Sequence, residues 1–294
     1  MAERDPINFA KMAGAGNDFV VIDNEADRIR DPADLARRVS TRALSVGADG
    51  LILVEPSSRA SFRMRYYNAD GSLGEFCGNG TRCAARFAFI EGIAEAIMTI
   101  ETDAGIVEAE VGEDGQVTIS LPPPEEFRAE RPVTVGEMAV HGSSITVGVP
   151  HYVVFLREAL WEQDIKPLGS AIRMHHDLQP KGSNVNFVLV RDEHSIEVRT
   201  YERGVEAETL ACGSGVVASV AVSTLFGKVK PPVRVLTRSG ITLEVSMTHT
   251  NGELRDVRLK GDARLVFRGT MTPETLEGFD PEWARNTTQA AAAT

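Results

Sequence analysis

The feature of this sequence that most constrains its fold is an internal repeat with a constant offset of 135 residues. Self-similarity at a fixed spacing indicates repeated structural units. The offset aligns seven residues of the first half, across thirty positions and without a gap, with identical residues of the second: Cys77, Gly78, Gly80, Gly92, Thr102, Gly105 and Ile106 with Cys212, Gly213, Gly215, Gly227, Thr237, Gly240 and Ile241. Four of the seven are glycines, so a coincidence of turn residues is the alternative. We interpret the repeat as two halves of one topology, each with a Cys-Gly-x-Gly element.

The residues after each Cys-Gly-x-Gly element have the pattern of a helix. After Gly80, apolar residues recur at helical spacing, and Arg82 lies off that apolar stripe. The stretch 216–226 carries no charge, which predicts a helix buried on all sides. Gly92 and Gly227 stand where glycines end helices.

Alternating apolar and polar residues predict strands in both halves, at 62–67, 106–111, 117–121, 186–190, 195–201 and 241–245. The predicted fold class is α+β, with two pseudo-symmetric strand-rich domains, each wrapped around a central helix. We expect the active site in the cleft between them. The predicted halves are 1–121 plus 262–273, carrying Cys77, and 122–261, carrying Cys212; residues 274–294 are predicted to form a flexible tail.

Composition excludes several classes of function. The net charge of −11, without a block of Lys and Arg, argues against a nucleic-acid partner. No secretory signal and no membrane-spanning stretch is evident, so we expect a cytoplasmic protein that does not bind a membrane. Three widely spaced cysteines form neither a disulfide framework nor a zinc-binding pattern, which predicts free thiols and no metal.

The two Cys-Gly-x-Gly elements predict acid–base chemistry. A cysteine at the start of a helix feels the positive end of the helix dipole, which favours its thiolate. Glycines beside it leave backbone amides open to an anion such as a carboxylate. Inverting a Cα centre requires a base on one face and an acid on the other, and one thiolate with one thiol meets this need in both directions. We therefore predict that Cys77 and Cys212 invert the Cα of an amino acid without a cofactor.

Other interpretations apply to single cysteines. A buried cysteine is usually a small hydrophobic residue. We interpret Cys83 in this way, because it lies in the apolar stripe and its counterpart in the repeat is Ala218. Cys77 and Cys212 could also form a redox pair, and we interpret such a disulfide as an inactive oxidised state of the same site.

Three segments carry a resemblance to a known family. They are Lys11-Met-Ala-Gly-Ala-Gly-Asn-Asp-Phe-Val, Tyr67-Asn-Ala-Asp-Gly-Ser-Leu-Gly-Glu-Phe-Cys-Gly-Asn-Gly-Thr-Arg-Cys, and Glu202-Arg-Gly with Glu208-Thr-Leu-Ala-Cys-Gly-Ser-Gly. The chain resembles the diaminopimelate epimerases over roughly residues 7 to 270. This resemblance implies the diaminopimelate-epimerase fold and PLP-independent interconversion of LL- and meso-diaminopimelate, in lysine and peptidoglycan precursor synthesis.

The resemblance also implies the residues of the site. Those that would bind the distal end of the substrate are Asn17, Asn68, Asn184, Glu202 and Arg203. Those whose backbone amides would hold the reacting α-carboxylate are Gly78, Asn79, Gly213 and Ser214. His151 would assist Glu202 in deprotonating a cysteine, or would serve a structural role. A homodimer is a common form in the resembled family, and the sequence does not itself disclose the oligomeric state.

Three departures from the family pattern bear on the substrate. The chain has Val149 where the family usually has asparagine before Pro-His, and Gly50 where glutamine is frequent. The stretch 204–209 is one residue longer than the commoner form. The changes at Val149 and Gly50 favour one alternative, a related racemase or epimerase of another amino acid. A second alternative is a non-catalytic amino-acid-binding or thiol-redox protein, against which the retention of both cysteines argues, because binding alone needs neither.

Overall fold

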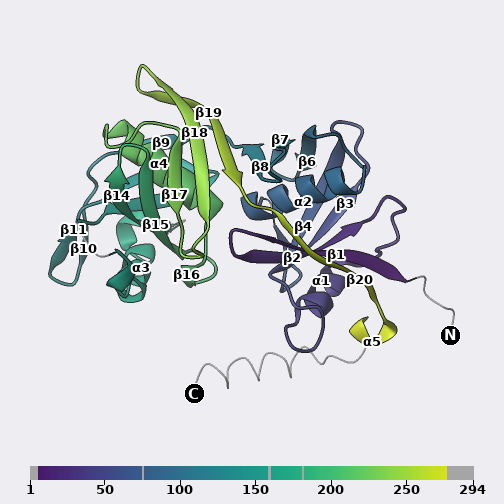
Figure 1. The fold of residues 1–294 in the computed structure, drawn as a ribbon. Coiled ribbons are helices and arrows are strands. Elements are labelled where there is room, and N and C mark those ends of the chain that lie inside the picture. Colours follow the sequence, from purple (N-terminus) through teal and green to yellow (C-terminus); the bar gives the residue numbers. More distant parts are fainter. Residues whose placement is uncertain (1–5, 75, 158–159, 181, 277–294) are drawn as a thin grey trace. The chain divides into compact units, whose positions relative to one another are not determined.

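A computed structural model describes residues 6–74, 76–157, 160–180 and 182–276 of the chain. The chain forms two compact units, Met1–Gly115 with Ala263–Thr294, and Gln116–Asp262. Both are rich in strands (Figure 1). Within the described ranges, none of the helices combines the length and the apolar composition that a bilayer span requires.

The first unit is built from two separate segments of the chain, a long one that ends at Gly115 and a short one that begins at Ala263. In order, its elements are β1 (Ile7–Gly14), β2 (Asn17–Asp23), α1 (Pro32–Ser40), β3 (Gly50–Glu55), β4 (Phe62–Asn68), β5 (Leu73–Gly74), α2 (Gly78–Ile90), β6 (Ile97–Thr102), β7 (Gly105–Val111), β20 (Arg264–Met271) and α5 (Pro273–Leu276). β2 pairs in parallel with β3, and β4 in parallel with β6. Antiparallel pairs join β1 to β2 and β20, β3 to β4, β4 to β5, and β6 to β7.

The second unit repeats this order of elements. It contains β8 (Val117–Ser120), β9 (Glu125–Arg128), β10 (Val133–Val135), β11 (Met138–Val140), β12 (Ser143–Val147), β13 (Val149–Phe155), the 3-10 turn η1 (Leu160–Glu162), α3 (Lys166–Arg173), the 3-10 turn η2 (His176–Leu178), β14 (Asn184–Asp192), β15 (Ser195–Glu202), β16 (Ala207–Thr209), α4 (Gly213–Leu225), β17 (Val233–Leu236), β18 (Thr242–Thr250) and β19 (Glu253–Gly261). β13 and β14 are parallel, as are β15 and β17. β12–β13, β14–β15, β15–β16 and β17–β18 are antiparallel. Strands β12–β18 therefore correspond to β1–β7, and the two units share one topology.

The central helices show the repeat most directly. α2 spans Gly78–Ile90 and α4 spans Gly213–Leu225, so both of their ends differ by the offset of 135 residues. α2 packs against β1, β2, β3, β4 and β7, and α4 against the corresponding β12, β13, β14, β15 and β18. Figure 1 shows each helix among the strands of its own unit. The predicted α+β fold, with strands wrapped around a central helix in each half, is confirmed.

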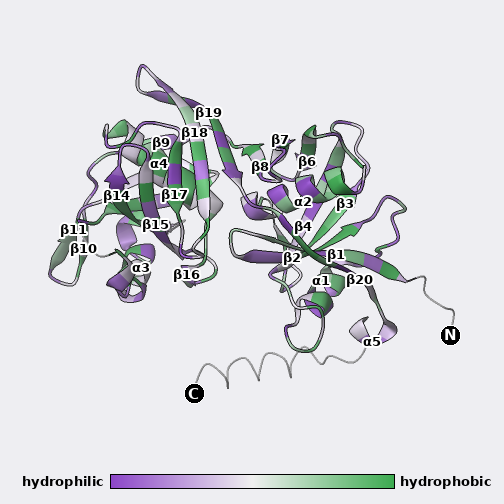
Figure 2. Cartoon of the chain, in the orientation of Figure 1, coloured by the Kyte–Doolittle hydropathy of each residue, from purple (hydrophilic) through white to green (hydrophobic). Residues whose placement is uncertain are grey.

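Each unit has a further hydrophobic cluster, on the face of its strands that points away from the central helix. In the first unit α1 covers a cluster that includes Val20, Leu51 and Tyr67. In the second, α3 covers a cluster that includes Tyr152 and Phe187. Figure 2 shows hydrophobic residues alternating with hydrophilic ones along β18 and β19, the pattern of strands with one buried face.

The sequence predicts that residues 116–121 and residue 262 belong to the first half, whereas the structure groups them with the second unit. The reason is the pairing of β8 with β19, in which Val117–Ser120 lie beside the strand that ends the second unit. Of the predicted tail, residues 273–276 form the short helix α5 (Pro273–Leu276). Residues 277–294 lie outside the described part of the chain.

Both central helices end as the sequence predicts. Gly92 has a φ of +71° and Gly227 a φ of +65°, and no atom of another residue lies where their Cβ would be. Gly92→Ala and Gly227→Ala should therefore each lower the free energy of unfolding by about 1 kcal/mol, through backbone strain alone. Urea titrations measure this loss. Asparagine at the same positions should cost less, and an equal loss with asparagine would contradict this explanation.

Candidate active site

In the first unit, Cys77 caps the start of α2. Its backbone is extended (φ −142°, ψ 104°), and its Sγ accepts a hydrogen bond from the Gly80 N–H at 3.4 Å. Cys77 is half-buried and borders a small cavity. The helix therefore begins at the residue after the cysteine, and the sulfur lies at the positive end of the helix dipole. This is an arrangement that favours a thiolate.

A chain of hydrogen bonds leads from the same turn to Asn17. Arg82 Nη2 donates to Asn79 Oδ1 (2.9 Å), Asn79 Nδ2 donates to Asn17 Oδ1 (2.7 Å), and Asn17 Nδ2 donates to Asp49 Oδ2 (2.9 Å). Because a guanidinium can only donate, it fixes which way the Asn79 amide faces, and Asn79 in turn fixes Asn17. Asn17, Asn79 and Cys77 are thus held around one helix start.

Arg82 lies off the apolar stripe of its helix, yet its side chain is fully buried. The strands enclose α2 on its polar side too, and Asn79 Oδ1 and the Gly78 carbonyl accept from the guanidinium. A buried charge needs such partners to be tolerated.

Two other positions of the first unit lie at strand ends. Asn68 ends β4, and its Nδ2 donates to Ser72 Oγ at 2.9 Å. Gly50 begins β3, where a Cβ would lie 2.5 Å from the Tyr67 carbonyl oxygen and 2.6 Å from the Tyr66 ring. The glutamine that the family often has at this place would therefore not fit the backbone seen here.

In the second unit, Cys212 occupies the corresponding N-cap position of α4, but its side chain makes no cap hydrogen bond to the helix. Its backbone is again extended (φ −114°, ψ 110°), and its Sγ lies 3.6 Å from Ser214 Oγ. Gly213 and Ser214 form the first turn of the helix. Cys212 is more buried than Cys77, with 7% of its surface exposed. The prediction of a cysteine at the start of each central helix therefore agrees with the backbone of both units.

Asn184, Glu202 and Arg203 lie together on β14 and at the end of β15. Asn184 Oδ1 accepts a hydrogen bond from the Arg203 backbone N–H at 2.7 Å. Burial raises the pKa of the Glu202 carboxyl. The longer stretch after Arg203 forms a turn in which Glu206 has a φ of +56°, and the Tyr201 hydroxyl donates to the Glu206 carbonyl at 2.8 Å. The turn therefore accommodates the extra residue of this stretch, and its hydrogen bond from Tyr201 fixes it to β15.

His151 lies on β13 and is fully buried. Its Nδ1 is 3.1 Å from Asn186 Nδ2, and Asn186 Oδ1 accepts from the Thr200 hydroxyl at 2.9 Å. Burial lowers the pKa of His151 to about 3, with a further contribution from the positive charge of Arg203. The imidazole is therefore neutral at physiological pH and is a poor general base.

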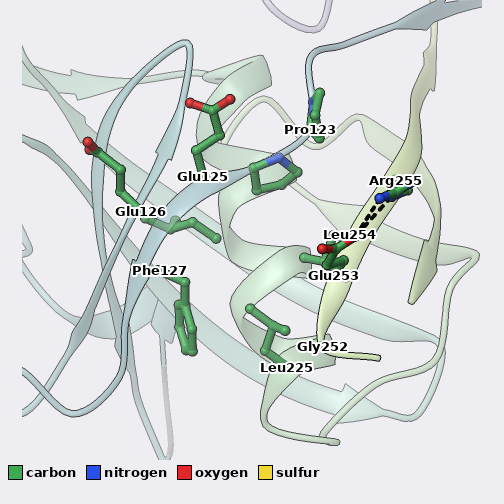
Figure 3. A pocket seen from close by; sticks show the side chains of 11 residues that line it. Pro123, Glu125, Glu126, Phe127, Leu225, Gly252, Glu253, Leu254 and Arg255 are labelled. Atoms are coloured by element: carbon green, nitrogen blue, oxygen red, sulfur yellow. Dashed lines mark hydrogen bonds and ion pairs between the residues drawn. The ribbon is translucent and has the colours of Figure 1, made fainter. Parts of the chain in front are cut away.

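A larger groove of about 480 Å³ lies elsewhere in the second unit, and none of the predicted site residues lines it. Figure 3 shows Phe127 and Leu225 beside it, with the ion-paired Glu253 and Arg255 on one side. Open grooves of mixed character without converging polar groups are weak candidates for catalysis.

One group of described residues has the composition of a metal site, namely His175, His176 and Asp177. The His175 ring already bonds on both sides, with the Thr134 carbonyl at 3.1 Å and the Asp177 N–H at 3.2 Å. These contacts explain the histidine as the cap of η2, and we assign no ligand to it.

A solved structure shares this fold. The probable proline racemase from Agrobacterium radiobacter K84, solved with bound carbonate, matches with a TM-score of 0.70. The match covers 95% of this chain and 95% of that chain at 17% identity. At that identity the likeness shows the fold alone, which is one found in a racemase.

Sequence relatives then define the family. The model of the family "Diaminopimelate epimerase" matches residues 9–125 and 143–266. Diaminopimelate epimerase from Aquifex aeolicus is 44% identical over 283 residues, covering 92% of this chain and 100% of the relative. The enzyme of that name from Chlorobaculum tepidum is 42% identical over 264 residues, covering 89% and 100%. The chain belongs to the diaminopimelate epimerase family, a family of isomerases, which confirms the resemblance seen in the motifs.

Sequence reasoning missed the side chains that hold the predicted site in place. Arg82, Asp49, Asn186 and Thr200 each bond to a predicted residue or to a neighbour of one. A signal was present for Asn186, because a fully buried asparagine in an apolar strand needs partners. Its partners come from other strands, so the sequence could not identify them.

The lowered pKa of His151 makes a prediction for stability. A histidine in the unfolded chain has a pKa near 6.5. Below that pH, His151 binds a proton in the unfolded state but stays neutral in the native state. Stability should therefore fall as pH drops from about 6.5 toward 3, by about 2.7 kcal/mol at about pH 4.5. Urea titrations of wild type and His151→Gln should show this fall reduced by that amount in the variant. The exposed His176→Gln serves as the control and should keep the wild-type slope.

A second prediction concerns the last glycine of each Cys-Gly-x-Gly element. An alanine Cβ at Gly215 would lie 2.3 Å from Asn186 Oδ1, whereas at Gly80 it would lie 3.2 Å from the end of the Ile52 side chain. Gly215→Ala should cost about 2–3 kcal/mol through overpacking. Gly80→Ala should stay within about 1 kcal/mol, because alanine also favours the helix. Equal losses in urea titrations of the two variants would contradict this difference.

Proposed function

We propose that this protein is a diaminopimelate epimerase that interconverts the LL and meso forms through Cys77 and Cys212, without a cofactor. The observation that carries the proposal is the equivalence of the two cysteines. Each occupies the N-cap position of the central helix of its unit, and the two helices begin at corresponding residues of the same topology. A reaction that adds a proton on one face and removes it from the other needs two such groups.

The proposed chemistry is a proton transfer at one carbon. One cysteine, as the thiolate, removes the Cα proton and becomes a thiol. The other cysteine, as the thiol, delivers its proton to the opposite face and becomes a thiolate. Backbone N–H groups of Gly78 and Asn79, and of Gly213 and Ser214, would hold the α-carboxylate and stabilise the negative charge that develops. Supporting this, α2 and α4 begin at these residues, where N–H groups lack partners within the helix.

The distal end of the substrate would be bound by Asn17, Asn68, Asn184, Glu202 and Arg203. An ammonium group suits an acid and amide oxygens, and a carboxylate suits an arginine. Three strand-end positions correspond between the units. Asn17 begins β2 as Val149 begins β13, Gly50 begins β3 as Asn184 begins β14, and Asn68 ends β4 as Glu202 ends β15.

The polar members of these pairs are divided between the units. Asn17 of the first unit corresponds to the apolar Val149, and Asn184 of the second unit corresponds to Gly50. Each unit would therefore contribute one of these two amide side chains to the distal end. His151 belongs to the same proposal as an auxiliary residue. We further propose a cytoplasmic homodimer acting in lysine and peptidoglycan precursor synthesis.

The second candidate is a racemase or epimerase of another amino acid. Val149 and Gly50 favour it, because both replace polar residues that the family often uses. A solved structure of the same fold, described as a hydroxyproline epimerase from Agrobacterium vitis, carries bound trans-4-hydroxy-L-proline. The two candidates differ only in substrate, so one assay separates them.

Exchange in D2O tests the proposal. Under reducing conditions, the wild type should place deuterium at Cα of diaminopimelate and interconvert its isomers. Cys77→Ala and Cys212→Ala should each lose epimerisation by about 10³-fold or more, because inversion needs both groups. Mass spectrometry measures the exchange, and chiral chromatography measures the isomers.

Cys83→Ala is the matched control, because Cys83 is fully buried in α2 and Ala218 occupies the corresponding place in α4. This variant should keep activity within about twofold of the wild type, since a small change in packing leaves the chemistry intact. Wild-type exchange with other amino acids but not with diaminopimelate would favour the second candidate. No exchange with any amino acid would refute both.

A further inference from the structure

Three buried polar side chains lie beneath the start of α4. They are His151 on β13, Asn186 on β14 and Thr200 on β15, all with at most 3% of their surface exposed. Asn186 joins the other two, because its amide contacts His151 Nδ1 at 3.1 Å and the Thr200 hydroxyl at 2.9 Å. We call these residues the polar triplet.

The first unit has apolar or aromatic residues at the same three places. In the strand register, Asn186 faces Thr200 as Ile52 faces Tyr66, and His151 lies beside Asn184 as Phe19 lies beside Gly50. Phe19 and Tyr66 are in edge-to-face contact, with ring centroids 5.9 Å apart. Apolar and aromatic side chains therefore suffice to support a central helix in this topology. Packing alone does not require the polar triplet.

The orientation of the Asn186 amide follows from its neighbours. The Cβ built at Gly215 would lie 2.3 Å from Asn186 Oδ1, so this oxygen lies against the first turn of α4. The first turn of a helix presents N–H groups and a positive potential, which attract the oxygen of an amide and repel its NH2 group. The Thr200 hydroxyl donates to the same oxygen. The amide NH2 must then face His151.

The tautomer of His151 follows in turn. Because Asn186 Nδ2 can only donate, His151 Nδ1 accepts and carries no proton. A neutral imidazole with a bare Nδ1 has its proton on Nε2. Nε2 is buried, and within the described ranges it has no hydrogen-bond partner. A buried donor left without an acceptor is costly, which indicates that an acceptor arrives during function.

We propose that Asn186 is a positioning residue that, with Thr200, holds His151 as a neutral Nε2–H donor for an anion of the reaction. That anion is either the thiolate of Cys212 or a carboxylate of the bound substrate, and both are acceptors for the same N–H. The inference deepens the proposed function and rests on it. It replaces a basic role for His151 with that of a fixed donor, which needs no change of protonation during turnover.

The tautomer can be measured without any substrate. In protein labelled with ¹⁵N-histidine, long-range ¹H–¹⁵N correlation spectra distinguish a protonated Nε2 from a protonated Nδ1. His151, identified by its loss in His151→Gln, should show a protonated Nε2 and should not titrate between pH 5 and 8. A protonated Nδ1, or titration in that range, would overturn the proposal whatever the enzyme's substrate proves to be.

Asn186→Asp reverses the tautomer with little change of shape. The carboxylate accepts from Thr200 and, unlike the amide, also accepts from His151 Nδ1–H, so Nε2 becomes bare. The start of α4 favours the added negative charge. Activity at about pH 8 should fall about 10- to 100-fold. It should recover in part toward about pH 6, where the imidazole takes up a proton and regains Nε2–H despite the nearby positive charge of Arg203.

Asn251→Asp is the matched control, because it adds the same charge at an exposed turn of the same unit. This variant should keep the wild-type rate and tautomer. A rise in the pH at which Cys212 ionises, followed by ultraviolet thiolate absorbance in a Cys77→Ala background, would identify the thiolate as the acceptor. A higher KM without that rise would identify the substrate carboxylate. An Asn186→Asp protein that shows the reversed tautomer and the wild-type rate would refute the proposal.

Discussion

The fold depends on the burial of most of one central helix in each unit. Strands around such a helix leave little solvent to hydrogen-bond with the N–H groups of its first turn. In α2 one of those groups, on Gly80, bonds to the sulfur of Cys77. The same enclosure half-buries Cys77 and buries Cys212, and the partial removal of water strengthens the field of the helix at each residue. The residue before each central helix therefore both begins the helix and lies where a thiolate is favoured. Because the topology is duplicated, the chain has two such residues, Cys77 and Cys212.

Much of this architecture could be predicted from the sequence because it depends on local patterns. The offset of 135 residues identified the repeat, and the ends of α2 and α4 follow that offset. Glycine positions identified the helix ends, since only glycine adopts a positive φ without strain. The strands followed from alternation of apolar and polar residues.

Other parts could not be predicted because they depend on contacts between distant segments. Arg82 lies off the apolar stripe of its own helix, yet the strands around α2 bury it. The pairing of β8 with β19 joins residues more than a hundred positions apart and moves the boundary of the first half. Asn186 carried a signal as a polar residue in an apolar strand, although its partners His151 and Thr200 become evident only in the folded sheet.

The close packing at Gly50 restricts which side chains this position can hold. A side chain there would meet the backbone of β4 at Tyr67, so the glutamine common in relatives cannot be restored by one substitution. A longer side chain at residue 50 would require β4 to move, which couples the identity of this residue to the backbone around it. The course of β4 therefore restricts residue 50 as much as the chemistry of the site does.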